Sequence, residues 1–224
     1  MKIAVCLSGM PRNIENSYTW LKESILDVLD ANNINWDIFI STWNNDDTNH
    51  LHKKFKPEVI NIGTYNSETE KHLGWDKFKE HKFEIEPRVS CLAQFDRIYT
   101  CNNVRKEHEK KNNIQYDIII RTRTELKFNN RLDIKELDII KNCESPVIFL
   151  RQGPNPQNIH WYKDNFAIMN RAGVDIYSDC INHLLSISKL TQVSTAELIL
   201  RNWLDLNKNL LVKHTSLDYT LTRN

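Results

Sequence analysis

The stretch YDIIIRTRTELKF, residues 116–128, carries the strongest fold signal in the chain. Its three consecutive isoleucines are typical of a strand that is buried on both faces of a parallel sheet. Arg121, Arg123 and Glu125 then follow at alternate positions, and an extended backbone would point all three side chains the same way. We therefore expect a buried strand with a charged tip.

Outward from this stretch, strand and helix patterns alternate along the chain, which predicts an open α/β sheet flanked by helices. Further strands are predicted at 2–8, 36–43, 57–63, 145–150, 165–170, within 208–216 and within 218–223, and helices at 15–30, 89–111, 134–140, around 174–185 and at 195–206. Residues 64–88 are expected to be a loop with a short helix near 75–81, and 151–164 a long loop interrupted by two prolines and one glycine. The 224 residues fit one domain.

Charge and cysteine content exclude several kinds of partner. The 30 basic and 29 acidic residues give a formal net charge of +1, so no overall field attracts nucleic acid or an acidic membrane. The five cysteines form no C-x-x-C pair, which argues against a disulfide framework or a thiolate metal site. The first apolar run is too short for a signal peptide or a membrane span. We therefore expect a cytoplasmic protein without a transmembrane segment.

The charged tip of the central strand is the first candidate site, because ligands of open α/β sheets bind beyond the carboxyl ends of the strands. Guanidinium groups are permanently charged and match phosphate oxygens in shape, and a nearby carboxylate could hold a divalent ion. The alternative is a structural ion pair between Glu125 and either Arg121 or Arg123. The spacing alone leaves both interpretations open.

The end of the first strand, S-G-M-P-R, is the second candidate. Gly9 would let the backbone approach a ligand. Arg12 would lie at the same edge of the sheet as the charged tip of the central strand if the first strand neighbours the central one. The alternative is a turn glycine followed by a surface arginine. The fragment has neither the glycines of a dinucleotide fingerprint nor the G-K-[ST] of a P-loop.

Three segments together resemble a known family: KIAVCLSGMPRN, QFDRIYTCNNVRKEHEKKNNIQYDIIIRTRTEL and DNFAIMNRAGVDIYSD. They are similar to a group of small GT-A-like glycosyltransferases from bacterial polysaccharide clusters and large DNA viruses. In that group the first strand ends in S-G-x-x-R, a later strand ends in Y-D-x-x-x-R-x-R-x-D-L, and an aspartate precedes a D-x-F-A-I type strand. The resemblance implies a GT-A-like, Rossmann-type sheet with a donor half at about 1–126 and an acceptor half at about 127–224.

The resemblance also assigns roles to individual residues. Those that it places at the nucleotide-sugar donor are Ser8, Gly9, Arg12, Gln94, Arg121 and Arg123. It places Glu125 at the diphosphate and its metal, Mg²⁺ or Mn²⁺, although the family pattern has aspartate at this position. The extra methylene of glutamate moves the carboxylate outward, and the two arginines could neutralise a leaving diphosphate without an ion.

The segment before residue 165 supplies the expected acceptor side. Asp164 is the candidate catalytic or acceptor-side carboxylate, or alternatively a turn former. His160 and Trp161 could contact a sugar, or could anchor the loop. Glu197 is another acidic position of the family type, but Ser194 and Glu197 also have the spacing of a capping box.

Two functions follow as expectations. The first is transfer of a sugar from a nucleotide-diphosphate sugar to a hydroxyl of a glycan or lipid-linked glycan, as in polysaccharide biosynthesis. The alternative is a nucleotide- or anion-binding α/β module without catalysis. Nucleic-acid binding is not expected, because the chain has no basic excess and no recognised nucleic-acid module.

Overall fold

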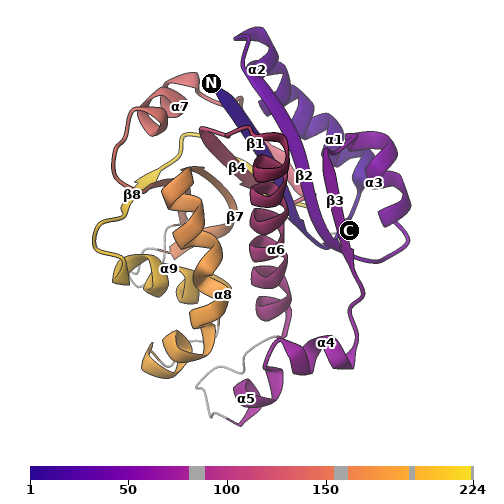
Figure 1. The fold of residues 1–224 in the computed structure, drawn as a ribbon, viewed down its shortest axis with the longest axis vertical. Coiled ribbons are helices and arrows are strands. Elements are labelled where there is room, and N and C mark those ends of the chain that lie inside the picture. The colour runs from indigo at the N-terminus through magenta and orange to yellow at the C-terminus, as the bar shows by residue number, and fades with distance from the viewer. Residues whose placement is uncertain (81–88, 154–160, 192–194, 223–224) are drawn as a thin grey trace.

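The structure, a computed structural model, describes residues 1–80, 89–153, 161–191 and 195–222. These residues form a mixed seven-stranded sheet with helices on both faces, together with a second sheet of two short strands (Figure 1). The expected Rossmann-type open α/β sheet is confirmed.

The large sheet contains β1 (Lys2–Gly9), β2 (Asn35–Trp43), β3 (Val59–Gly63), β4 (Ile118–Thr122), β6 (Val147–Gly153), β7 (Trp161–Asn170) and β8 (Leu211–His214). The small sheet pairs β5 (Leu126–Phe128) with β9 (Tyr219–Leu221). The helices are α1 (Ile14–Leu21), continued through a π-helical turn (Lys22–Leu26) into α2 (Asp27–Ala31), then α3 (Thr48–Phe55), α4 (Ser67–His72), α5 (Trp75–Lys79), α6 (Val89–Asn112), α7 (Ile134–Lys141), α8 (Arg171–Thr191) and α9 (Ala196–Leu206).

The strand order of the large sheet is β3-β2-β1-β4-β7-β6-β8. The first four strands in this order are mutually parallel, β7 is antiparallel to β4 and β6, and β8 is parallel to β6. The chain moves outward from β1 to β3, and α6 then returns it to the other side of β1, where β4 begins. The gap between the carboxyl ends of β1 and β4 is thus a topological switch point, where open α/β sheets bind ligands.

Both faces of the sheet are buried. In β1, Ile3, Val5 and Leu7 belong to a cluster with residues of α1, α3 and α7, whereas Ala4 and Cys6 belong to a cluster with residues of α6, α8 and α9. Burial on both faces explains why the parallel strands read as nearly continuous apolar runs and not as alternating patterns. Figure 1 shows α6 and α8 crossing one face of the sheet, with α1 and α3 behind it.

The predicted strand at 116–128 is wrong in its second half. The strand β4 ends at Thr122, residues 124 and 125 form a turn, and residues 126–128 leave the large sheet to pair with β9. The predicted loop at 151–164 is also too long, because β6 continues to Gly153 and β7 already includes Trp161. Because β4 ends at Thr122, Arg121 belongs to this strand, whereas Arg123 and Glu125 follow it.

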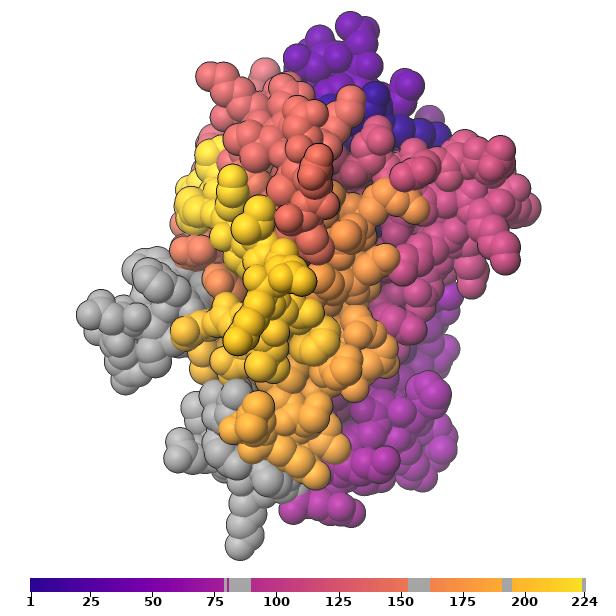
Figure 2. Space-filling view, turned by 60° about the vertical axis from the view of Figure 1, so that its left-hand side comes forward, coloured from indigo at the N-terminus to yellow at the C-terminus, as the bar shows by residue number. Residues whose placement is uncertain are grey.

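The C-terminal segment lies against α7 and β6, and Figure 2 shows it lying across this side of the molecule. Glu136 on α7 is buried, and its carboxylate accepts hydrogen bonds from the Thr215 hydroxyl (2.7 Å) and from the Ser216 backbone N–H. These hydrogen bonds satisfy the buried carboxylate of Glu136.

The two expected halves share one sheet, since β4 from the first half pairs directly with β7 from the second. Within the described ranges, no helix is both long and apolar enough to cross a lipid bilayer. The expected absence of a transmembrane helix agrees with this finding for those residues.

Candidate functional site

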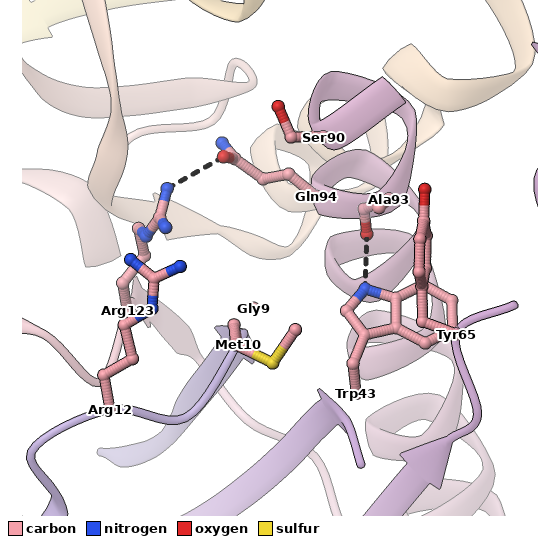
Figure 3. Close-up of a pocket in the computed structure, with 9 residues that line it drawn as sticks. All are labelled: Gly9, Met10, Arg12, Trp43, Tyr65, Ser90, Ala93, Gln94 and Arg123. Atoms are coloured by element: carbon pink, nitrogen blue, oxygen red, sulfur yellow. Dashed lines mark hydrogen bonds between the residues drawn. The ribbon is translucent and has the colours of Figure 1, made fainter. Parts of the chain in front are cut away.

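A cavity of about 370 Å³ opens at the switch point of the sheet (Figure 3). It is lined by Gly9, Met10, Arg12, Trp43, Tyr65, Ser90, Ala93, Gln94 and Arg123. These residues come from the ends of β1 and β2, from segments just beyond β1, β3 and β4, and from the start of α6. In Figure 3 two arginines lie on one side of the cavity and two aromatic rings on the other.

Gly9 ends β1 in a conformation that other residues avoid. Its φ angle is +121°, outside the regions that are favourable for residues with a Cβ atom. A Cβ atom at Gly9 would lie 4.0 Å from Nε of Arg123, which is an ordinary contact distance. Backbone conformation, and not crowding, therefore explains the glycine. Gly9 lines the cavity, and the approach of its backbone to a ligand stays a prediction.

Arg123 forms one part of the cationic wall. Its Nη1 donates to Oε1 of Gln94 at 2.8 Å and more weakly to Oδ1 of Asn165 at 3.4 Å, and its Nη2 donates to the carboxylate of Glu125. The side chain is 12% exposed, and its Nε, close to Gly9, is buried without a hydrogen-bond partner. The guanidinium is thus fixed in orientation by three neighbours.

Arg12 completes this wall. Its side chain is exposed, lines the cavity and makes no hydrogen bond or ion pair within the described part of the chain. In Figure 3 the guanidinium groups of Arg12 and Arg123 lie on the same side of the cavity. The charge of Arg123 is balanced by Glu125, whereas no carboxylate of the described residues balances Arg12, so Arg12 would attract an anion to the cavity.

The aromatic wall is held rigidly. Trp43 donates its indole N–H to the carbonyl of Ala93 at 3.3 Å, and the guanidinium carbon of Arg97 lies 3.9 Å from the indole ring centroid. Tyr65 meets Trp43 edge to face, with ring centroids 5.3 Å apart. A Cβ atom at Gly63 would lie 2.9 Å from Cζ3 of Trp43 and 2.7 Å from Nη1 of Arg97, so the glycine that ends β3 leaves room for this packing.

Tyr65 stays a neutral phenol. Its hydroxyl donates to the carboxylate of Glu70 at 3.0 Å, and burial together with this hydrogen bond raises the pKa of Tyr65 to about 12. The aromatic side of the cavity therefore carries no charge of its own at neutral pH. It suits a flat, uncharged group.

The first turns of α6 form a further part of the lining, through Ser90, Ala93 and Gln94. The N-terminal end of a helix carries unpaired backbone N–H groups and a partial positive charge, both of which favour anions. In this 24-residue helix they add to the charges of the two arginines.

A buried layer lies beneath the cavity. Arg121 is 2% exposed; its Nε donates to the hydroxyl of Ser8 at 3.1 Å, and its Nη1 donates to the carbonyl of Asp164. The hydroxyl of Tyr177 donates to the same carbonyl at 3.2 Å. Ser8 and Arg121 do not line the cavity, contrary to the expected contact with the donor, because β4 still holds Arg121 inside the sheet.

Asp164 is neither a loop residue nor a turn former. It lies within β7 and is 3% exposed, and its carboxylate accepts a hydrogen bond from Nε2 of Gln94. The expectation that Asp164 faces an open pocket is therefore wrong. Gln94 is placed between this carboxylate and the cavity.

Glu125 is fully buried, at 0% exposure, and forms the ion pair with Arg123 that the sequence left open. The other oxygen of its carboxylate has no hydrogen-bond partner. In the residues that the structure describes, no three His, Cys, Asp or Glu side chains come together. Glu125 therefore does not fit the expected metal ligand, and we derive no step through a cation.

The acceptor-side residues are only partly described. His160 lies outside the described residues, and Trp161 is described only as the first residue of β7, without its side chain. Ser194 of the expected capping box is also outside them, and α9 instead has Thr195 at its N-cap, without a side-chain cap.

Replacing Glu197 with Gln is expected to stabilise the protein at neutral pH. Burial, followed by the charge of Asp164, raises the pKa of the Glu197 carboxyl above its ordinary value of 4.5. A carboxyl whose pKa is higher in the folded chain than in the unfolded chain opposes folding once it ionises. The destabilisation therefore grows as the pH rises above the pKa of the unfolded chain. The unfolding temperature of Glu197→Gln should be higher than that of the wild type at pH 7, and the two temperatures should be equal below about pH 4. A pH-independent difference would contradict this explanation.

No protein-family model matches the chain, and no curated protein matches it either. The site must therefore be interpreted from its geometry. Sequence reasoning found Gly9, Arg12, Gln94 and Arg123 but missed the aromatic wall. Trp43 ends a predicted strand and Tyr65 follows another, so the strand-end rule would have found both if applied to every strand.

Proposed function

We propose that this protein is a glycosyltransferase that uses a nucleotide-diphosphate sugar. The observation that carries the proposal is the cavity at the switch point, which joins a cationic wall to an aromatic wall. Its volume of about 370 Å³ falls within the range of small-molecule sites, about 300–1,000 Å³. Such a cavity suits a ligand that is anionic at one end and flat at the other.

The cationic wall would hold the diphosphate. Arg12, Arg123 and the start of α6 offer permanent charge and N–H donors on one side of the cavity. When the bond from the sugar carbon to the diphosphate oxygen breaks, negative charge grows on the departing diphosphate. Donors already fixed in place stabilise this charge without having to reorganise, which lowers the barrier.

The aromatic wall would hold the nucleobase. Tyr65 is half-buried and Trp43 is 4% exposed, so Tyr65 presents most of the uncharged surface. The indole that it meets edge to face is fixed by Ala93 and Arg97. A base packed there would leave the diphosphate pointing toward Arg123, across the cavity. The sugar would then lie beyond the diphosphate.

The acceptor hydroxyl must lose a proton as its oxygen bonds to the sugar carbon. The described lining contains no carboxylate and no histidine, and Asp164 lies behind Gln94. We therefore assign no general base among these residues. An acceptor of the glycan or lipid-linked glycan type remains part of the proposal, as does a role in polysaccharide biosynthesis.

A cytoplasmic location belongs to the same proposal, since nucleotide sugars are the donors it requires. It is supported by the five cysteines, none of which forms a disulfide and three of which are buried. Cysteines without disulfides are typical of a reducing compartment.

The second candidate function is a non-catalytic nucleotide- or anion-binding module. It is favoured by the absence of a carboxylate from the described lining and by the pairing of Glu125 with Arg123. The two functions differ in turnover, not in binding. Both predict affinity for a nucleoside diphosphate.

Turnover separates the two candidates. The purified protein is incubated with a panel of UDP-, GDP- and CMP-linked sugars, with and without Mn²⁺ or Mg²⁺, and released nucleotide is measured. We expect release from at least one diphosphate-linked sugar and none from the CMP-linked sugars. Binding without any release would favour the module, and neither binding nor release would contradict both.

A further inference from the structure

We propose that Gln94 is a positioning residue that ties the cavity arginine Arg123 to the buried carboxylate of Asp164. On this view Asp164 contributes to donor binding through the Gln94 amide and is not the base that contacts the acceptor. The inference rests on the proposed function, because it assumes that Arg123 binds the donor diphosphate.

The direction of the amide is fixed by chemistry. A guanidinium can only donate hydrogen bonds, and an ionised carboxylate can only accept them. Oε1 of Gln94 therefore accepts from Nη1 of Arg123 at 2.8 Å, while Nε2 donates to the carboxylate of Asp164. Rotating the amide by half a turn would place donor against donor and acceptor against acceptor. Glutamine is thus matched to both neighbours at once.

The far end of this chain of contacts is anchored in the sheet. Asp164 lies in β7, and its backbone carbonyl accepts from the buried side chains of both Arg121 and Tyr177. Asp164 is 3% exposed as a residue, so its carboxylate has little freedom to reach a substrate. The contacts run from the sheet through Asp164 and Gln94 to Arg123, which lines the cavity.

The same arrangement explains how Arg123 is oriented. Glu125 holds Nη2, and Gln94 with Asn165 holds Nη1, so the guanidinium has one fixed orientation, with its buried Nε next to Gly9. A flexible arginine loses rotamer entropy when it binds phosphate, and a preorganised one loses less. Removing the Gln94 contact should therefore weaken phosphate binding although Gln94 itself carries no charge.

The experiment is a double-mutant cycle measured by calorimetry with inorganic pyrophosphate as the probe. The variants are Gln94→Met, which keeps length but removes the amide, Asp164→Ala, and the two combined. We expect each single variant to weaken pyrophosphate binding about 10-fold and the double variant to be no weaker than the singles, because both act through one chain of contacts. Asp164→Asn retains an acceptor oxygen for Gln94 and should recover most of the affinity that Asp164→Ala loses.

Two controls keep this result specific. Gln115→Met makes the same substitution at an exposed position outside the cavity and should not alter pyrophosphate affinity. Thermal unfolding of every variant identifies any that fail to fold, and the Asp164→Asn comparison, which perturbs packing least, remains available if Asp164→Ala does so. A loss in folded Asp164→Ala that Asp164→Asn does not recover would overturn the inference.

The inference and the proposed function fail in different ways. The positioning role would be overturned if the fold-loss of pyrophosphate affinity in the double variant equalled the product of the two single losses. A Gln94→Met variant with wild-type affinity would overturn it too. Either result would do so even if the protein turns over nucleotide sugars. Wild-type turnover that Asp164→Asn abolishes without changing pyrophosphate affinity would make Asp164 a catalytic residue and also overturn the inference. If the double variant loses no more pyrophosphate affinity than the single variants, and the wild type turns over no nucleotide sugar, the positioning role at an anion site is supported and the transferase is contradicted.

Discussion

Replacing Arg123 with Ala is expected to weaken binding of UDP or GDP about 10- to 150-fold while changing the affinity for the bare nucleoside less than about 2-fold. The estimate corresponds to hydrogen bonds with a charged partner, worth about 1.5–3 kcal/mol. Arg123 lies on the cationic wall, away from the aromatic wall where the base would pack. Calorimetric titration of both ligands against both proteins measures the difference.

This variant has a side effect that must be separated from binding. Glu125 is fully buried and ion-paired with Arg123, so removing the arginine leaves a charge unpaired inside the protein. Breaking such a pair costs about 3–5 kcal/mol, whereas neutralising both partners costs much less. The combined variant Arg123→Ala/Glu125→Gln should therefore be more stable than Arg123→Ala and still bind the diphosphate weakly.

Two further variants test the specificity of the loss. Arg123→Lys keeps the charge but not the planar fork, so it should fall between the wild type and Arg123→Ala. Arg131→Ala removes an exposed arginine that does not line the cavity, and diphosphate affinity should be unchanged. Equal losses for diphosphate and nucleoside in Arg123→Ala/Glu125→Gln would contradict a diphosphate role for this residue.

Replacing Gly173 with Ala is expected to destabilise the fold by about 2–3 kcal/mol, near the upper end of overpacking costs. A Cβ atom at Gly173 would lie 2.4 Å from the backbone carbonyl oxygen of Val147 and 3.1 Å from Oδ1 of Asn170. That same Oδ1 accepts from the backbone N–H groups of Gly173 (2.9 Å) and Val147 (3.1 Å), which joins the start of α8 to β6. The clash is with backbone, so no side chain can simply move aside.

The sign of this effect distinguishes packing from helix propensity. Alanine is ordinarily better than glycine in a helix by up to about 1 kcal/mol, so propensity alone predicts stabilisation. The neighbouring exposed position gives the matched control, because Ala172→Gly should cost no more than about 1 kcal/mol. Denaturant unfolding measures both. A Gly173→Ala variant as stable as the wild type would show that α8 can shift away from β6 at little cost.

The layered fold was predictable from local patterns. The apolar runs at β1, β2 and β4 and the helical spacing in α1, α6 and α8 are properties of the sequence itself. The order of the strands was not predictable in this way. The position of β7 between β4 and β6, antiparallel to both, depends on contacts between residues far apart in the chain. A short apolar run does not indicate which strand it pairs with.

The candidate site was predicted only in part, because the sequence does not show where the strand that carries its charged residues ends. Counting alternate positions from Arg121 assumed that the strand continues to Glu125, but β4 ends at Thr122 and the chain turns. The turn brings Glu125 back to Arg123 and leaves Arg121 in the buried layer with Ser8. The sequence identified the charged residues but could not show which of them reach the cavity.

The central claim is that the cavity beside β1 and β4 receives the diphosphate of a nucleotide. A crystal structure of the protein soaked with UDP or GDP tests this most directly. We predict phosphate oxygens within about 3 Å of the Arg123 guanidinium, with the base against Trp43 and Tyr65. A nucleotide bound in another part of the molecule, or one whose diphosphate lies away from Arg123, would contradict the claim.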